Sequence, residues 1–385
     1  MWTRRRFLTV AGSAAASVVA GAGFGRAGTS RSEPTPGARP TGPSAPATAS
    51  SAVATLARAR ADLRQLVTAR AVTVDDPWTL MHAVLPLGPE VRHGDELVID
   101  YVTRTFAETR TAGGNAYPMF PVNVEAHPNH FLEIMYATGV EPDRPFPSKA
   151  GPITRRDLYA GAKTLFSPAT VSDELAWTVS IFTAEMRPGA DRFENGDGRT
   201  FSVSALVETA AQSAEGLYAD TVAAMRGAKP YGRSALQGCA CNGTHAIYGL
   251  LDALRNGYRA NELAARVTQL MHAALFRLGP ESALIDQMIG RGGAPSATLN
   301  ADAAKLQFLG HSIENLRFAE RFKVYQPSAD ESARVRAAEE ELAAVAHRMV
   351  AVYDLDGLAR QVPRAYRTIL GDACHALRGL ETPSR

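Results

Sequence analysis

The chain has 385 residues, of which 41 are Lys or Arg and 39 are Asp or Glu, for a formal net charge of +2. Residues 1–50 hold six Arg and one Glu, so the rest of the chain has 41 − 6 = 35 basic and 39 − 1 = 38 acidic residues, a balance of −3. A slightly acidic domain lacks the basic footprint that nucleic acid requires, so we predict no nucleic-acid partner.

The N-terminus has the order of a twin-arginine export signal. Arg4, Arg5 and Arg6 precede Phe7-Leu8, and a run rich in Ala, Val and Gly follows. This run is too weakly apolar for a spanning helix, and small residues suit cleavage near residue 23 or 28. We therefore expect residues 1–27 to be a signal peptide read by the twin-arginine export machinery. We also expect no stable membrane span after cleavage and a periplasmic or extracellular location.

Residues 28–51 are rich in Pro, Ser and Ala, and they bury too little apolar surface to offset the entropy of ordering them. We predict a disordered linker there. No second linker of this kind follows, so residues 52–385 are predicted to form a single domain.

Hydrophobic periodicity of about 3.6 residues recurs through this domain, whereas alternating strand patterns are scarce, so we predict an all-α fold. Asp76, Thr154 and Ser328 have the side chains of helix N-caps. The pattern at residues 189–201 is compatible with a short β-hairpin. Residues 109–129 form the longest predicted non-helical stretch. Helices are predicted near residues 54–70, 77–87, 96–108, 129–139, 154–166, 172–187, 203–226, 241–258, 261–278, 298–321, 329–353 and 363–380. Helices joined in this way can close as a ring of helical hairpins, an α/α toroid. An α-helical solenoid is the alternative.

The three cysteines, Cys239, Cys241 and Cys374, are an odd number for an exported protein. Cys239 and Cys241 are too close in sequence to bridge each other comfortably. A disulfide from Cys374 to either of them would close a long loop and constrain the unfolded chain. The pairing remains open.

The clearest chemical pattern is Cys-Asn-Gly-Thr-His at 241–245, which opens a predicted helix. On that helix Cys241, His245, Tyr248 and Asp252 fall on one stripe. Cys and His four residues apart can ligate one metal ion, but two ligands are half a site. The alternative is a core thiol beside a hydrogen-bonded histidine. The pattern favours this alternative, so we predict no cofactor, with zinc held by Cys241 and His245 as the other interpretation.

A second stripe, on the helix predicted at 298–321, carries His311 and Glu314. Residues three apart touch on a helix, and a carboxylate beside an imidazole raises its basicity, which suits general acid/base catalysis. The alternative is an ion pair. The Gly310-His311 step in an apolar helix favours close packing over a free surface.

Two further patterns combine aromatic and histidine side chains. His127 and His130 flank a proline at a predicted helix start, where a neutral ring suits a base, a ligand or a backbone contact. Trp177, and Trp78 with His82, offer aromatic surface beside polar groups, which suits stacking on a sugar or packing in the core.

The helical hairpins and these two motifs resemble the broad class of α/α-toroid proteins. Gly310-His311-Ser312-Ile313-Glu314 is similar to the Gly-His-x-x-Glu segment of N-acylglucosamine 2-epimerase-type enzymes, which implies an acid/base role for His311 with Glu314 alongside. Cys241 with His245 is similar to the zinc sites of toroidal prenyltransferases and lanthionine cyclases, which implies that both are ligands.

We therefore expect an exported toroid protein, with three alternatives for its function. In the first, it is a lyase, epimerase or hydrolase acting on a saccharide or similar small polar ligand. His311, Glu314 and His127 would then be catalytic, and Trp177, His245, Tyr248 and Asp252 would bind substrate. The second is a Cys/His zinc protein, and the third is a non-catalytic scaffold or ligand-binding domain.

Overall fold

The computed structural model describes residues 49–171, 175–290 and 295–381, and in these ranges the protein is mostly helical. The predicted signal peptide and nearly all of the predicted linker lie outside the described residues. The predicted hairpin within 189–201 is confirmed in its essentials by β5 and β6. The described strands form three antiparallel pairs: β1 (Arg92–His93) with β2 (Glu96–Leu97), β3 (Glu108–Ala112) with β4 (Asn115–Met119), and β5 (Arg192–Glu194) with β6 (Thr200–Ser202).

The long helices follow the predicted order closely, because apolar periodicity and capping residues specify them locally. Their bounds are α2 (Ala49–Ala69), α3 (Pro77–Leu87), α4 (Val98–Phe106), α6 (His130–Ala137), α7 (Arg155–Thr164), α9 (Leu175–Glu185), α10 (Val203–Met225), α11 (His245–Arg255), α12 (Leu263–Gly290), α13 (Pro295–Arg321), α14 (Ala329–Ala351) and α16 (Pro363–Glu381). The short helices α5 (Val122–Glu125), α8 (Pro168–Val171) and α15 (Leu355–Gln361) lie between them. The start of the helix predicted at 172 falls on residues 172–174, outside the described residues.

Three predicted N-caps are confirmed. The Asp76 carboxylate accepts the backbone N–H of Thr79 at 2.9 Å, ahead of α3. Thr154 and Ser328 form capping boxes with acidic residues three positions on, at the starts of α7 and α14. Each cap satisfies backbone donors that the first helical turn leaves without intrahelical partners.

Two local predictions need correction. The helix predicted from residue 241 begins at His245, because Cys241 and Asn242 have φ angles of 47° and 54°, in the left-handed region. The predicted stripe therefore starts at His245, and Cys241 lies in the preceding 3-10 turn, η3 (Ala240–Gly243). The stretch 109–129, predicted to be non-helical, holds β3 and β4 in agreement with that prediction but also the short helix α5.

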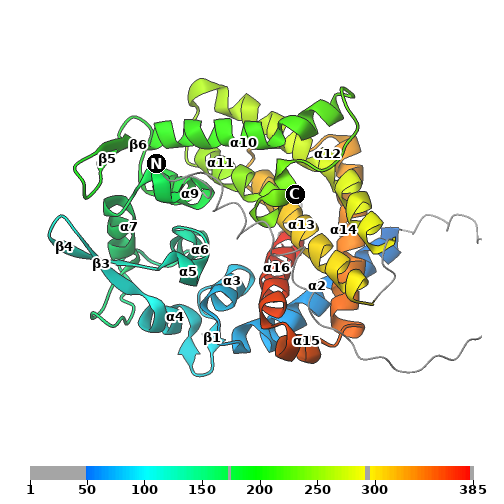
Figure 1. Ribbon diagram of the computed structural model, residues 1–385, viewed down its shortest axis with the longest axis horizontal. Coiled ribbons are helices and arrows are strands. Elements are labelled where there is room, and N and C mark those ends of the chain that lie inside the picture. Colours follow the sequence, from blue (N-terminus) through cyan, green and yellow to red (C-terminus); the bar gives the residue numbers. More distant parts are fainter. Residues whose placement is uncertain (1–48, 172–174, 291–294, 382–385) are drawn as a thin grey trace, which may run out of the picture.

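Six helices contact one another in a closed cycle around the centre of the molecule. In spatial order they are α3, α6, α9, α11, α13 and α16, and α16 returns to α3 (Figure 1). The helices α2, α4, α7, α10, α12 and α14 lie outside them and alternate with them along the chain. We call the two sets the inner and outer helices. Each outer helix and the inner helix next to it in the chain form a hairpin, and the inner helix of each hairpin has one face toward the centre of the molecule.

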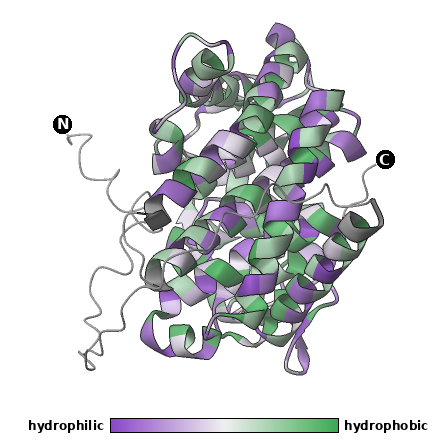
Figure 2. Ribbon diagram, turned by 90° about the vertical axis from the view of Figure 1, so that its right-hand side faces the viewer, coloured by the Kyte–Doolittle hydropathy of each residue, from purple (hydrophilic) through white to green (hydrophobic). Residues whose placement is uncertain are grey.

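Buried apolar side chains from both sets form one continuous cluster, and hydrophilic residues alternate with them along the helices (Figure 2). None of the described helices combines the length and the apolar character needed to cross a membrane. None of the three cysteines forms a disulfide, so neither of the two pairings considered for Cys374 is present. The Cys374 thiol instead lies buried in α16 and donates to the Leu370 carbonyl.

Candidate metal centre

Six of the nine histidines gather at the centre of the inner helices, and five of the inner helices contribute to them. We call these residues the histidine cluster: His82, His127, His130, His245, His311 and His375. Neighbouring ring centroids lie 4.8 Å apart for His82–His130, 5.5 Å for His130–His127, 5.3 Å for His127–His245, 5.2 Å for His245–His311, 3.9 Å for His311–His375 and 5.1 Å for His375–His82. The rings therefore follow one another around a closed circuit.

Five members of the cluster are buried. Their exposed fractions are 2% for His82, 1% for His130, 6% for His245, 2% for His311 and 3% for His375, and His127 is half-buried. Histidine is usually found partly exposed, and buried polar groups are normally hydrogen-bonded. A buried group of this many imidazoles therefore calls for a chemical explanation.

Hydrogen bonds fix the tautomer of two of these rings. His82 Nδ1 donates to the Trp78 carbonyl at 2.6 Å, and His311 Nδ1 donates to the Gln307 carbonyl at 2.8 Å. A carbonyl oxygen only accepts, so Nδ1 carries the proton. In a neutral imidazole the other nitrogen, Nε2, then has no proton and can act only as an acceptor or a metal ligand.

A carboxylate fixes the same tautomer in His375. His375 Nδ1 lies 2.6 Å from Glu314 Oε2, and Arg378 Nη1 donates to Glu314 Oε1 at 2.8 Å. A histidine held through Nδ1 by a carbonyl or carboxylate, with Nε2 directed elsewhere, is the usual arrangement of a metal-binding histidine.

Burial keeps these rings neutral. It lowers the pKa of His82, His130, His311 and His375 well below the ordinary value, and neighbouring histidines lower it further. A neutral imidazole is the form that binds a metal ion.

Close helix packing brings His311 and His375 together. A Cβ on Gly310 would lie 3.0 Å from the Ala376 side chain and 3.1 Å from its backbone. Glycine therefore allows α13 and α16 to approach closely beside the two rings. This agrees with the close packing predicted from the Gly310-His311 step.

The turn before α6 positions His130. Glu125 accepts the backbone N–H groups of Asn129 at 2.9 Å and Phe131 at 3.1 Å, and burial raises the pKa of this carboxyl to about 8. Asn129 itself has a left-handed φ of 66°. His130 is almost fully buried, yet neither ring nitrogen has a hydrogen-bond partner among the residues that the structure describes.

Cys241 joins the cluster through the η3 turn. Potential ligand atoms of Cys241, His245 and His311 all lie within 4.8 Å of one another. Three consecutive residues, Cys241, Asn242 and Gly243, have positive φ. For the first two this backbone is strained, and such strain often marks a functional site.

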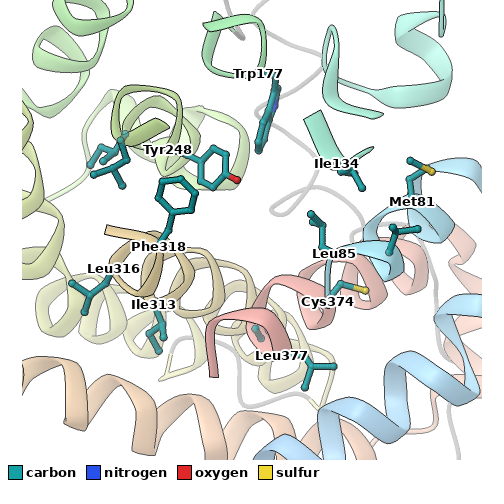
Figure 3. Close-up of a cluster of buried hydrophobic side chains, with 14 of the residues drawn as sticks. Met81, Leu85, Ile134, Trp177, Tyr248, Ile313, Leu316, Phe318, Cys374 and Leu377 are labelled. Atoms are coloured by element: carbon teal, nitrogen blue, oxygen red, sulfur yellow. The ribbon is translucent and has the colours of Figure 1, made fainter. Parts of the chain in front are cut away.

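The residues predicted to bind substrate converge on the same centre. Trp177 stacks on His130 with ring centroids 4.4 Å apart and meets His245 edge-on at 4.6 Å. The Tyr248 hydroxyl donates to Glu133 at 2.8 Å, and burial raises the pKa of Glu133 to about 7. Figure 3 shows Trp177 and Tyr248 among the buried hydrophobic side chains of the inner helices.

One predicted pairing differs from the one that forms, and one predicted substrate-binding residue is engaged elsewhere. Glu314 accepts from His375 and Arg378, whereas His311 is held by a backbone carbonyl, so Glu314 does not orient His311 through a hydrogen bond. Asp252 continues the stripe of α11 but pairs with Ser180 and Arg255. The rings of His311 and His245 do converge, with centroids 5.2 Å apart.

Sequence reasoning missed His375 and linked His82 only to Trp78. Each is an isolated histidine within an otherwise apolar stretch of helix. Such a histidine recurs in α3, α13 and α16, and this recurrence was the available signal. No protein-family model, curated protein or solved structure matches the chain.

Proposed function

We propose that the inner and outer helices form an α/α toroid. The support is the closed cycle of contacts among inner helices and their strict alternation with outer helices along the chain. A solenoid stacks its repeats in an open series, and its first and last repeats do not meet. Here α16 contacts α3, which favours the ring.

At the centre of this ring, we propose, Cys241, His245 and His311 bind a transition-metal ion, making the protein an exported metalloprotein. The observation that carries this proposal is the mutual approach of their ligand atoms to within 4.8 Å. His311 supplies the third ligand that sequence spacing did not reveal. Thiolate and imidazole donors together suit zinc or copper.

The orientation of His311 supports metal over simple core packing. Its Nδ1 is committed to Gln307, and its Nε2 is buried without a hydrogen-bond partner. Leaving a buried acceptor unsatisfied costs about 1–3 kcal/mol, and a metal ion would remove that cost. A core thiol and a satisfied histidine, the alternative considered above, would not leave this nitrogen exposed to the cluster.

The site favours chemistry on a small molecule. Three protein ligands with a further position open is the arrangement of catalytic zinc sites, in which the metal supplies a Lewis acid and an activated water. The surrounding residues hold the site: the Gln307 carbonyl orients the ligand His311, and Glu314 with Arg378 orients His375, whose ring lies beside that of His311. Because the ligands are nearly all buried, a bulky substrate would have to displace packed side chains.

The saccharide hypothesis receives less support from this geometry. The broad face of Trp177 stacks on the His130 ring, at the position that a sugar would need. The export route, by contrast, suits the metal proposal. Twin-arginine export carries folded proteins, so the ion can be bound before the protein leaves the cytoplasm.

The test measures metal in protein exported by its own signal. We expect at least one equivalent of a transition metal per chain, with loss of one equivalent in Cys241→Ser and in His311→Ala. His347→Ala is the matched control, because His347 lies on an outer helix with a side chain 42% exposed and pairs with Asp62. Its metal content should equal that of the unaltered protein.

Folding is checked by circular dichroism and thermal unfolding of each variant. Metal-free wild-type protein that also fails to bind added Zn²⁺ or Cu⁺ would overturn the proposal. Folded Cys241→Ser and His311→Ala variants that keep the full metal content would overturn it as well.

A further inference from the structure

A pocket lies where the β3–β4 hairpin meets α5, α6 and α7, and its volume is about 110 Å³. An enclosed cavity of roughly 150 Å³ holds one benzene molecule, so a pocket of this size suits an apolar group of about four or five carbon atoms. The inner end of the pocket is lined by apolar side chains that are almost fully buried: Phe120, Leu132, Leu158 and Phe166.

Two small residues on α7 shape one wall of this pocket. A Cβ on Gly161 would lie 2.4 Å from the Pro118 carbonyl oxygen, so glycine allows α7 to lie directly against β4. The next residue, Ala162, lines the pocket. Its short side chain leaves space that a longer one would fill.

Arg110 adds a positive charge to the pocket from the exposed side of β3. Within the part of the chain that the structure describes, its guanidinium has no ion pair and no side-chain hydrogen bond. Other arginines of this region do have partners, since Arg104 pairs with Glu96 and Arg144 pairs with Asp100. A guanidinium without a carboxylate of its own is available to a carboxylate from solution, which it can bind through two parallel hydrogen bonds.

Among the described residues that line the pocket, only Glu125 is acidic. Its carboxylate is 4% exposed and accepts the backbone N–H groups of Asn129 and Phe131, one on each oxygen. Burial raises the pKa of Glu125 to about 8, so most of this carboxyl is uncharged at neutral pH. The positive charge of Arg110 is therefore not cancelled inside the pocket.

We propose that this pocket binds a short-chain carboxylic acid, with its apolar tail among the buried side chains and its carboxylate on Arg110. The apolar lining selects the tail, and the charge of Arg110 selects an anion over an amine. None of Cys241, His245 and His311 is among the described residues that line the pocket. The inference therefore does not rest on the proposed metal site.

The pocket borders the histidine cluster through the turn before α6. Glu125, Pro128 and Asn129 of this turn line the pocket, while His127 and His130 belong to the cluster. Asn129 has a left-handed φ of 66°, and such strained positions are common at binding sites. A bound acid would therefore lie beside the turn that carries two histidines of the cluster.

The experiment is a ligand-observed NMR titration of the full exported chain at pH 7, with hexanoate as the probe. We expect hexanoate to bind, and butanoate to bind about tenfold more weakly because it buries two fewer CH₂ groups. Acetate lacks the tail and hexylamine has the opposite charge, so neither should bind measurably. Arg110→Gln should weaken hexanoate binding about fivefold and leave the affinity for 1-hexanol unchanged.

Two further variants test the position of the ligand. Ala162→Leu fills the pocket and should abolish the binding of both hexanoate and 1-hexanol. Arg192→Gln is the matched control, because Arg192 is an exposed arginine on β5 and is not among the described residues that line the pocket. Its affinity for hexanoate should equal that of the unaltered protein.

Three results would overturn the inference: no hexanoate binding to the wild-type protein, full affinity in folded Ala162→Leu, or full affinity in Arg110→Gln. Arg110 is exposed, so Arg110→Gln remains a test if Ala162→Leu misfolds. The titration is repeated after chelation. Equal hexanoate binding in chelated and untreated protein is expected, and it keeps this inference separate from the metal proposal.

Discussion

Two buried polar clusters contact the η3 turn, and their hydrogen bonding differs. The first is the histidine cluster. The second is a set that we call the arginine cluster, formed by Arg277, Glu281, Tyr231, Tyr218 and Gln237. Arg277 is fully buried and donates to the Asn242 carbonyl at 2.9 Å, to Tyr231 at 3.2 Å and to Glu281 at 3.3 Å. Gln237 completes the set by donating to Glu281 at 2.7 Å.

The comparison separates a structural network from a functional one. In the arginine cluster donors and acceptors meet, so its burial is compensated. In the histidine cluster the Nε2 atom of His311 and both nitrogens of His130 have no partners. The two clusters are connected because Arg277 donates a hydrogen bond to the carbonyl of Asn242, the residue after Cys241. The arginine cluster therefore stabilises the strained η3 turn, and this turn places Cys241 beside the histidine cluster.

The largest effect is expected from Arg277→Met. Removing one partner of a buried charged pair leaves Glu281 uncompensated, which costs about 3–5 kcal/mol. Urea unfolding measures this loss. Arg156→Met is the control, because Arg156 pairs with Asp143 on the surface and its loss should leave the unfolding midpoint almost unchanged. Equal midpoints for the two variants would contradict a structural role for the arginine cluster.

A second prediction concerns the histidine cluster in metal-free and metal-loaded protein. In metal-free protein His130→Leu should change the free energy of unfolding by less than about 1.5 kcal/mol, because the ring has no hydrogen bond to lose. In metal-loaded protein the cost should stay the same, because His130 is not one of the three proposed ligands. Thermal unfolding with and without a chelator measures the difference. A larger cost in the metal-loaded protein would show that His130 also contacts the bound ion.

The η3 turn itself is tested by Gly243→Ala. Gly243 has φ +72°, and an added Cβ would lie 2.4 Å from Leu236 Cδ2. We expect a loss of about 1–3 kcal/mol from backbone strain, together with a lower metal content. Gly216→Ala is the matched control: Gly216 lies on the exposed face of α10 with nothing within 4 Å, so alanine should stabilise by about 0.5–1 kcal/mol. A harmless Gly243→Ala would show that the turn tolerates a side chain.

The sequence predicts the helices well because their signals are local. Asp76 and Ser328 mark helix starts through hydrogen bonds that reach only three residues along the chain. Periodicity then specifies the buried face. The start of α11 was predicted four residues early because the left-handed conformation of Cys241 and Asn242 depends on Arg277, a contact made across 35 positions of sequence.

The site was only half predictable for the same reason. Cys241 and His245 are close in sequence, so their pairing is visible as a pattern. Their approach to His311, and the approach of His311 to His375, depends on how the inner helices close around the centre. No single helix carries that information, and a lone histidine on an apolar face looks the same whether it binds a metal or a backbone carbonyl.

The smallest effect is expected at a third polar group, on the outer helices, where the buried carboxyl of Glu331 pairs with the half-exposed side chain of His272. Burial alone would raise the pKa of Glu331, but hydrogen bonds from His272 at 2.6 Å and from Ser328 at 2.8 Å lower it to about 2. A carboxyl with a lowered pKa in the folded state adds stability above its unfolded pKa near 4.5, and this contribution disappears as the pH falls from about 4.5 to 2. Glu331→Gln should remove that part of the acid dependence, about 1–2 kcal/mol after allowance for solvent at His272. Urea unfolding at pH 6 and pH 3 measures it. An unchanged pH dependence in the variant would mean that the Glu331 carboxylate contributes no more than an ordinary surface group.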